Sequence, residues 1–582
     1  MQNSLKDWKP TAILEPYKES LFTGDWPTLP EMLRISTARN AKHPFFTDFD
    51  GEGGSKRTLS FAEVQEKTET LARWMAAEGV THGDRVAVTG KNSPEWGVVF
   101  LAAVSLGAII CPLDYALHTE EQENLLATAA PKLLFVDEEK YGHYAEKKQP
   151  FAVYSLSSKH PDVYVFNLHT QKEAPITSPV PEDTAAILFT SGTTSTPKGV
   201  MLSHRNLVSD AFIAQTNMII TCDDVFYALL PIHHAYTMQA VFIESLCVGA
   251  EIVFGKSMAV SRMMRDLKEG GITMMLGVPL LFNKLADGII KGLKSKGMVV
   301  YAVIRILMEV SYLIKKLFGV NPGKQMFKAV LQQANLYTVR IAISGGGPLS
   351  QQVFKFFNAM GINFVQGYGL TETSPIIALN PVEHFKIESV GSYFAGWMEM
   401  KILDPNEDGI GEICVKGPMV MQGYYKMPEE TAKVFTEDGF FKTGDLGWID
   451  DEHYVMLCGR AKNMIVTNGG KNVYPEEIED AFQLCDDIQQ ITVQGYTPDE
   501  DDTAEEIEAL IYPSDDLLKR LGFERSEINE GFRAGAVLEA IQKDVSAVNK
   551  DLQPYQRITK ITILEKPLEM TTTQKVKRNY SK

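Results

Sequence analysis

A run of hydroxyl-bearing residues and glycines with one lysine lies between two apolar segments of the chain. The run extends from Thr190 to Lys198, and the apolar residues 185–189 before it have the composition of a buried strand. Backbone N–H groups, hydroxyls and one ammonium group can together surround a phosphate. A Walker A loop needs Gly before its lysine and Ser or Thr after it, whereas Lys198 lies between Pro197 and Gly199. We therefore predict a phosphate loop unlike that of P-loop kinases and GTPases, with a Ser/Thr-rich surface turn as the alternative.

Three further groups of glycines and polar residues follow predicted strands at 228–232, 341–344 and 362–365. In a parallel sheet ligands collect at the carboxyl ends of the strands, so these groups are candidates for one site. A histidine at such a position is more often a core residue than a ligand. The third group offers an aromatic ring, glycines, a hydroxyl and a carboxylate, which suit an adenine, a phosphate and a metal ion. The groups contain His233 and His234, then Gly345 and Gly346, and then Gln366, Gly367, Tyr368, Gly369, Thr371 and Glu372.

Weaker candidates lie in the last third of the chain. Asp445 lies in a predicted turn flanked by glycines, and Arg460 follows a predicted strand at 454–457. Taken alone, each is an ordinary turn residue, and the basic tail that contains Lys575 resembles a frayed chain end. From residue 463 onward the pattern of strands and helices restarts. This restart predicts a domain boundary near residues 460–462.

Helix and strand patterns alternate through the first part of the chain. Predicted helix starts, marked by a capping box or an N-terminal proline, are at Ser60, Ser93 and Thr119. Apolar strands are predicted at 85–88, 108–113 and 133–136. Such alternation implies an α/β fold with doubly wound, largely parallel sheets.

Composition limits the class of protein. With 582 residues, 45% of them hydrophobic, the chain is expected to form a multidomain globular protein. A formal net charge of -17 argues against nonspecific binding of nucleic acid, which depends on excess Lys and Arg. The six cysteines form no C-x-x-C pair, and the first ten residues lack an apolar signal core. We therefore expect a cytoplasmic protein without a zinc site, a disulfide framework or a nucleic-acid partner.

Residues 291–320 form a basic and apolar segment with two interpretations. Lys291, Lys294 and Lys296 precede an apolar stretch in which charged residues recur at near-helical spacing. Those charges interrupt the roughly 20 apolar residues that a transmembrane helix needs. One interpretation is a buried amphipathic helix. The other is a helix that contacts a membrane and collects fatty acid from it, which would make the protein peripheral at the inner membrane surface.

The order of the motifs resembles that of the adenylate-forming superfamily, which comprises acyl-CoA synthetases, luciferases and nonribosomal adenylation domains. The motifs are the phosphate loop, His-Ala-Tyr at 234–236, Gly-Tyr-Gly-Leu-Thr-Glu at 367–372, Thr-Gly-Asp at 443–445 and Thr-x-Lys-Val-x-Arg at 573–578. Segment 291–320, the loop at 344–348 and residues 473–479 are most similar to long-chain fatty acid–CoA ligases. Two residues depart from the usual pattern, since Ser195 and Gln574 stand where glycine is common.

The resemblance implies an N-terminal extension at 1–30, a large AMP-binding N-terminal domain at 31–460 and a small mobile α+β domain at 461–582. It also implies a two-step reaction. A carboxylate attacks the α-phosphate of ATP to give an acyl-adenylate and pyrophosphate, and the thiol of coenzyme A (CoA) then displaces AMP. The implied acid is a fatty acid, and Mg²⁺ is the implied metal. Since no protein nucleophile is required, catalysis is expected to rest on positioning and charge stabilisation.

The resemblance assigns a role to each site residue by its position in the motifs. Phosphate binding would fall to Thr190, Ser191, Gly192, Thr193, Thr194 and Lys198, with Thr190 also near the metal. Nucleotide binding would fall to Gly345, Gly346, Gln366, Gly367, Gly369, Tyr368 on the adenine, Thr371 on the α-phosphate, and Asp445 and Arg460 on the ribose. Glu372 would bind Mg²⁺, His234 would border the acyl site, and Lys575 would bridge the carboxylate and the α-phosphate in the first step only. Gly469 and Gly470 would admit pantetheine, and Lys462 would be the hinge. The predicted catalytic residues are Lys198, His234, Thr371, Glu372 and Lys575.

Several alternatives stay open at the level of the sequence. The acceptor could be an acyl carrier protein, or the acid could be medium-chain or aromatic, because an acyl tunnel is built from the same apolar residues as a core. A nucleotide-binding sensor that has lost catalysis is the non-enzymatic alternative, and retention of Glu372, Asp445 and Lys575 argues against it. The sequence is also compatible with a homodimer.

Overall fold

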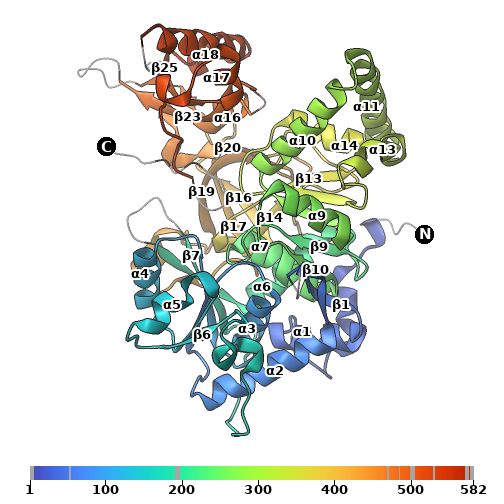
Figure 1. Ribbon diagram of the computed structural model, residues 1–582, viewed down its shortest axis with the longest axis vertical. Helices are drawn as coiled ribbons and strands as arrows, with labels where there is room; N and C mark the ends of the chain where they lie inside the picture. The colour runs from blue at the N-terminus through green and yellow to red at the C-terminus, as the bar shows by residue number, and fades with distance from the viewer. Residues whose placement is uncertain are drawn as a thin grey trace.

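The computed structural model describes residues 5–50, 54–190, 197–467, 471–483, 485–497, 505–528, 531–570, 576 and 578. Two large sheets and their helices make up most of the chain, and the last part forms a separate lobe at the top of Figure 1. The α/β fold predicted from the sequence is confirmed.

The first large sheet has seven strands and carries the phosphate loop. In spatial order the strands are β18 (Gly423–Tyr424), β8 (Lys198–Ser203), β7 (Thr184–Thr190), β4 (Ile109–Leu113), β3 (Arg85–Thr89), β5 (Leu133–Val136) and β6 (Ala152–Ser155). The pairs from β7 to β6 are parallel, whereas β7 with β8 and β8 with β18 are antiparallel. The hairpin of β7 and β8 therefore lies near one edge of an otherwise parallel sheet.

The second large sheet has nine strands and carries the other predicted motifs. Their order is β15 (Ser392–Tyr393), β14 (Ile376–Leu379), β13 (Asn363–Gly369), β12 (Ile341–Ser344), β11 (Met274–Gly277), β9 (Val225–Ala228), β10 (Glu251–Phe254), β1 (Pro44–Asp48) and β2 (Arg57–Ser60). Strands β13 to β1 are parallel, and the strands beyond them at either edge are antiparallel. The carboxyl ends of β12 and β13 consequently lie next to each other.

Helix α3 (Pro94–Ser105) joins the two sheets. It contacts β3 and β4 of the seven-stranded sheet and β1 of the nine-stranded sheet. Its residues from Pro94 to Val104 are buried, since apolar side chains occupy every face of the helix. One hydrophobic core therefore runs through both sheets, with α1 (Leu29–Asn40), α2 (Phe61–Ala77) and α6 (His204–Ala214) packed into it.

Capping signals located several helices correctly. Ser60 accepts a hydrogen bond from Glu63 N at the start of α2, and Ser93 accepts one from Trp96 N at the start of α3. The predicted cap at Thr119 is wrong by one residue, because α4 (Thr119–Ala129) has His118 at its N-cap. The Glu121 carboxylate accepts a hydrogen bond from His118 N at 3.0 Å, which is the contribution of the acidic residue to a capping box. The box therefore begins at His118 and not at Thr119.

Near the predicted site, the ends of three strands differ from those predicted. The strand before the histidines, β9, ends at Ala228, and a connection covers the residues up to His234. Strand β13 continues to Gly369, because β14 pairs with its second half. Strand β20 extends to Arg460, because β19 pairs with it along its length.

A third sheet, which the sequence did not predict, is fully antiparallel. It consists of β16 (Glu399–Leu403), β17 (Gly411–Lys416), β19 (Phe441–Ile449) and β20 (Val455–Arg460). Asp445 therefore lies within a strand and not in a turn.

The last lobe has a hydrophobic core of its own, formed by residues between Ile465 and Ile558. Its main sheet is β23 (Ile488–Tyr496), β24 (Glu506–Pro513) and β25 (Lys560–Ile563), and a small ladder joins β21 (Ile465–Val466) to β22 (Asn472–Val473). Helices α16 (Pro475–Asp480), α17 (Asp515–Leu521) and α18 (Gly531–Asp551) accompany these strands.

Candidate active site

The hairpin of β7 and β8 holds the two ends of the phosphate loop together. Thr190, the last residue of β7, is paired with Lys198, the first residue of β8, and its hydroxyl donates to the Lys198 carbonyl at 3.4 Å. Residues 191–196 between them lie outside the described residues. The two residues at the ends of the predicted phosphate loop are therefore paired with each other in the ladder of β7 and β8.

The Lys198 ammonium group is held by a carboxylate and an aromatic ring. Its Nζ donates to Glu430 Oε2 at 2.7 Å and lies 4.7 Å from the centroid of the Tyr424 ring. Hydrogen bonds from Lys198 and Lys433 lower the pKa of Glu430 to about 2. Glu430 therefore stays ionised at neutral pH and keeps the lysine near the end of the loop.

Tyr424 connects Lys198 with the predicted metal ligand. Its hydroxyl donates to Glu372 Oε1 at 2.9 Å, while its ring lies under the Lys198 ammonium group. Glu372 lies in the short 3-10 helix η9 (Thr371–Thr373), which contacts β8, and its backbone carbonyl accepts from Met421 N at 2.9 Å. Lys198 in the seven-stranded sheet and Glu372, which follows β13 of the nine-stranded sheet, thus belong to one cluster, and Thr371 precedes Glu372 in η9.

The end of β13 lies against the third sheet. Tyr368 donates from its hydroxyl to Asp445 Oδ2 at 2.6 Å, and Arg460 Nε lies 2.6 Å from Asp445 Oδ1. Asp445 on β19 and Arg460 on β20 are direct partners in the antiparallel ladder. Burial, followed by the charge of Asp445, raises the pKa of Tyr368, so this hydroxyl acts as a donor. An aromatic ring, a carboxylate and a guanidinium group are therefore gathered at one place.

Two glycine sites show how closely backbone and side chains approach here. A Cβ atom at Gly345 would lie 3.0 Å from the Tyr236 ring, whose hydroxyl donates to the Ile343 carbonyl at 3.0 Å. A Cβ atom at Gly369 would lie 1.5 Å from the Pro375 carbonyl oxygen. Gly346 has φ +80°, which L side chains seldom adopt. Gly369 is therefore required by sterics and Gly346 is favoured by its backbone conformation, whereas a side chain at Gly345 would press on the Tyr236 ring.

His234 lies beside a second histidine and a carboxylate. Its ring centroid is 4.2 Å from that of the buried His233, and His233 Nε2 is 3.3 Å from Asp114 Oδ1. One ligand atom from each of the three residues falls within 4.8 Å of the others. The structure therefore places His234 in a polar group at the start of α7 (Ala235–Thr237).

The predicted hinge residue follows directly on the Arg460 strand. Lys462 lies in the 3-10 helix η10 (Ala461–Asn463), and burial together with Arg460 lowers its pKa. Past this turn, Gln483 of the last lobe contacts the loop after β12. Gln483 accepts from Ser350 N at 2.8 Å and donates to the Pro348 carbonyl at 2.9 Å.

Several predicted residues cannot be located in the same way. The predicted site residues that lie outside the described residues are Ser191, Gly192, Thr193, Thr194, Gly469, Gly470 and Lys575. Arg578, the last residue of the terminal motif, is described, and its guanidinium donates to Glu479 Oε1 and Oε2 at 2.7 Å. This pairing joins Arg578 to α16 of the last lobe.

Four residues of the site escaped the sequence-based prediction. Tyr236, Tyr424, Glu430 and Gln483 contact predicted residues or the loop beside them. The signal for Tyr236 was its place in the His-Ala-Tyr motif. Glu430 and Gln483 carry no signal of their own, because their importance comes from partners more than 130 positions away in the chain.

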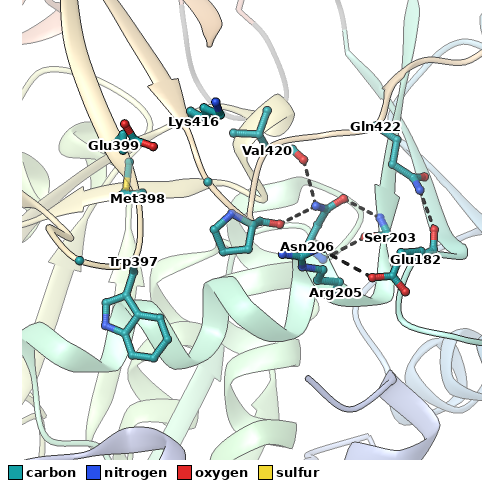
Figure 2. A pocket seen from close by; sticks show the side chains of 13 residues that line it. Glu182, Ser203, Arg205, Asn206, Trp397, Met398, Glu399, Lys416, Val420 and Gln422 are labelled. Carbon is teal, nitrogen blue, oxygen red and sulfur yellow. Dashed lines mark hydrogen bonds and ion pairs between the residues drawn. The ribbon is translucent and has the colours of Figure 1, made fainter. Parts of the chain in front are cut away.

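A cavity of about 640 Å³ lies elsewhere (Figure 2). Trp397, Lys416 and Arg205 contribute to its lining, and Asn206 closes one side by donating to the carbonyls of Pro418 and Val420. Its lining, as far as the structure describes it, includes none of the predicted site residues. The candidate site is therefore defined by the convergence of β7, β8, β13, β19 and β20.

Comparison with known proteins identifies the family of the chain. Residues 33–425 match the AMP-binding enzyme family. The chloroplastic long-chain-fatty-acid–acyl-carrier-protein ligase AEE15 of Arabidopsis thaliana is 27% identical, over 99% of this chain and 88% of that protein. The human long-chain-fatty-acid–CoA ligase 1 is 28% identical, over 89% of this chain and 80% of that protein. ATP-bound MatB from Rhodopseudomonas palustris has a TM-score of 0.72 and 26% identity, with 95% of this chain and 98% of that chain covered. The chain belongs to the AMP-binding enzyme family, within the adenylate-forming superfamily that includes the long-chain fatty acid–CoA ligases.

Proposed function

We propose that this enzyme activates a long-chain fatty acid with ATP and transfers the acyl group to CoA. The observation that carries the proposal is the cluster of Lys198, Tyr424 and Glu372 next to the end of β13. A cation and a carboxylate held by one tyrosine suit a triphosphate with its metal ion. The named activities of the Arabidopsis and human relatives support a long-chain acid.

In the first step the carboxylate oxygen of the acid attacks the α-phosphate of ATP, and pyrophosphate leaves. Lys198 stabilises the charge of the leaving phosphates, and Thr371 contacts the α-phosphate. Tyr368 stacks on the adenine, with Asp445 and Arg460 holding the ribose hydroxyls. Lys575 joins the attacking carboxylate to the α-phosphate. These groups lower the barrier by positioning and charge stabilisation, as in other phosphoryl-group chemistry.

The residues present fit a magnesium ion. Glu372 supplies a carboxylate and Thr190 a hydroxyl, and Mg²⁺ prefers such hard oxygen ligands together with phosphate oxygens. Tyr424 fixes one carboxylate oxygen of Glu372 by its hydrogen bond. When bound, the ion would neutralise phosphate charge.

In the second step the CoA thiol attacks the acyl carbonyl carbon, loses its proton, and displaces AMP. Gly469 and Gly470 admit the pantetheine arm, and His234 borders the acyl group. We further propose that residues 31–460 and 461–582 are the two domains, with the hinge at Lys462. The reaction takes place in the cytoplasm, where the six cysteines, which are all free in the structure, would stay reduced.

The test is pyrophosphate release measured with acids of graded chain length and with aromatic acids. Each acid is offered with CoA, with a phosphopantetheinylated acyl carrier protein, or with neither acceptor. We expect the highest kcat/KM for a long-chain acid and thioester formation on CoA. Transfer to the carrier protein alone, or preference for an aromatic or medium-chain acid, would replace the proposal with one of its alternatives. Absence of pyrophosphate release with every acid would favour a nucleotide sensor.

Lys575→Ala tests whether this lysine acts only in the first half reaction. Removing a preorganised cation from developing negative charge should slow acyl-adenylate formation by about 10²–10³-fold. Conversion of supplied acyl-adenylate to thioester should continue near the wild-type rate. Equal loss of both half reactions would mean that the lysine serves both steps or is structural.

A further inference from the structure

Helix α11 (Met298–Phe318) is an exposed helix at the periphery of the molecule. It extends along one edge of Figure 1, next to α10 (Pro279–Lys294), α13 (Lys328–Gln333) and α14 (Gln351–Met360). Of its 21 residues, only Ser311, Tyr312 and Lys315 are buried. The sequence-based alternative of a buried amphipathic helix therefore does not describe it.

The outward face of α11 carries a continuous apolar stripe. Its residues, at alternating spacings of four and three, are Val299, Val303, Ile306, Val310, Leu313 and Leu317. Their exposed fractions lie between 46% and 79%. Such spacing places all six on one side of a helix, over a length of roughly 27 Å. A soluble monomer seldom exposes an apolar surface of this extent without a partner.

Buried polar contacts fix which face of α11 points outward. Lys315 Nζ donates to Asn358 Oδ1 at 2.7 Å and to Asn363 Oδ1 at 2.9 Å, and the Ser311 hydroxyl donates to the Ala359 carbonyl at 2.8 Å. Turning the stripe inward would break these contacts and bury unpaired polar groups. The exposure of the stripe is therefore a property of the fold and not of a loosely attached helix.

The surroundings of the stripe are strongly basic in an otherwise acidic protein. Residues 284–328 contain nine Lys or Arg and two Asp or Glu, whereas the whole chain has a net charge of -17. Lys294 at the end of α10, and Arg305 and Lys316 within α11, are exposed. Glu309, one of the two acidic residues, is paired with Lys355 at 2.7 Å. Positive charge thus accompanies exposed apolar surface here.

From this combination we propose that α11 lies in the interface of an anionic lipid bilayer. Apolar side chains enter the headgroup boundary and flanking basic groups meet lipid phosphates, as in interfacial amphipathic helices. A second copy of the chain fits less well, because two copies of the same basic surface would repel each other. A single helix also offers less than the roughly 800 Å² per partner of a stable interface. Among the described residues, no helix combines the length and apolar composition needed to cross a membrane, so contact is at the surface.

Helix α10 connects this surface to the candidate site. A Cβ atom at Gly347, in the loop after β12, would lie 3.7 Å from Pro279 Cγ at the start of α10. The 16 residues of α10 cover roughly 24 Å from there to α11. If the proposed function holds, bilayer contact at α11 brings the enzyme to the phase in which long-chain fatty acids accumulate.

Vesicle co-sedimentation without ATP tests the proposal independently of catalysis. The full chain is mixed with vesicles of phosphatidylcholine alone or of equal parts phosphatidylcholine and phosphatidylglycerol. One triple variant removes apolar surface (Val303→Ser, Ile306→Ser, Val310→Ser), and another reverses charge (Lys294→Glu, Arg305→Glu, Lys316→Glu). A matched control replaces exposed valines elsewhere, Val180→Ser with Val260→Ser, which are 54% and 68% exposed.

We expect wild type and control to bind the anionic vesicles and to lose binding at high salt. Each basic residue near such a surface changes affinity by about fivefold, so the charge variant should bind at least about 100-fold more weakly. The apolar variant should lose binding as well, and its unfolding midpoint and its pyrophosphate release from a dispersed acid should match wild type. Equal binding by all proteins, or no binding by wild type, would overturn the proposal. So would a wild-type dimer in sedimentation velocity that the apolar variant converts to monomer, since a second copy would then cover α11.

Discussion

At the scale of single residues, the close approach of backbone segments decides which side chains the site tolerates. Strand β13 passes the Ser374–Pro375 segment so closely that Gly369 has no room for a Cβ atom. The pairing of β13 with β14 is irregular between Tyr368 and Gly369. The positions of Tyr368, directly before this glycine, and of Thr371, two residues after it, therefore depend on the close backbone approach at Gly369.

Gly369→Ala should disrupt the nucleotide site. The added methyl group would lie 1.5 Å from the Pro375 carbonyl oxygen, so the backbone must shift. Overpacking of this kind typically costs about 1–3 kcal/mol in folding free energy. We expect a lower unfolding midpoint and an increased KM for ATP in pyrophosphate release. Gly292→Ala in α10 is the control and should leave the KM for ATP unchanged without lowering the unfolding midpoint, because its methyl group would meet no atom of the described residues within 4 Å and alanine favours the helix.

Tyr424→Phe separates the two contacts of this tyrosine. The ring that faces Lys198 is kept, and only the hydroxyl that donates to Glu372 is removed. A hydrogen bond to a charged group contributes about 1.5–3 kcal/mol, so the orientation of Glu372 should become less well defined. We expect the Mg²⁺ concentration for half-maximal pyrophosphate release to rise about tenfold or more. Tyr425→Phe is the adjacent control, and an unchanged Mg²⁺ dependence in Tyr424→Phe would mean that the hydroxyl does not position Glu372.

At the scale of elements, α11 is attached to the domain by a buried lysine. Burial lowers the pKa of Lys315 to about 7, from an ordinary value of 10.5. Between these two pH values the unfolded chain binds a proton that the folded chain does not bind. The free energy of unfolding from this group therefore rises as pH increases from about 7 to about 10.5, and below pH 7 the full cost of burying the charge is present.

Lys315→Met should remove this pH dependence. Relative to the variant, wild type should gain stability as pH rises from 7 to 10, because its buried lysine loses the proton. Titrations elsewhere in the chain are common to both proteins and cancel in the comparison. The midpoint of urea unfolding, measured for both proteins across this range, gives the difference. A difference that stays constant with pH would show that Lys315 keeps its charge through its contacts with Asn358 and Asn363.

At the scale of the whole molecule, the last lobe must serve both proposed half reactions. Gln483 attaches it to the loop at Pro348 and Ser350, and the connection to the rest of the chain passes through Lys462. Rotation of a rigid lobe requires large φ/ψ changes at a few linker residues. The proposed hinge therefore lies where the chain leaves β20.

Lys462→Pro should uncouple the two half reactions. Proline restricts φ at residue 462 to about -65° and also disfavours helical φ/ψ at Ala461. We expect acyl-adenylate formation to stay measurable, while thioester formation from CoA falls at least about tenfold further, as for other hinge-dependent steps. Rapid-quench measurement of each half reaction gives the comparison, and Lys462→Ala, which keeps a flexible backbone, should behave like wild type in both. Normal thioester formation in Lys462→Pro would place the hinge elsewhere.

Local sequence by itself determined the positions of many helices and strands and the order of the motifs. Ser60 and Ser93 cap the helices that follow them, because an N-cap hydrogen bond reaches only the N–H groups two or three positions further along the chain. The ends of β9, β13 and β20, in contrast, were predicted wrongly. A strand end depends on the partner strand, and the partner is not visible in the local pattern.

The tertiary structure alone decided how the site is assembled and which surface stays uncovered. Tyr368 meets Asp445 across 77 positions of the chain, and Tyr424 meets Glu372 across 52. Asp445 was expected in a turn, yet it lies in a strand of a sheet that local patterns did not predict. The apolar stripe of α11 has the spacing of a buried helix face, yet its side chains are exposed, and the contacts of Ser311 and Lys315 keep it facing outward. Periodicity identifies a face of a helix, but what covers that face depends on packing between distant segments.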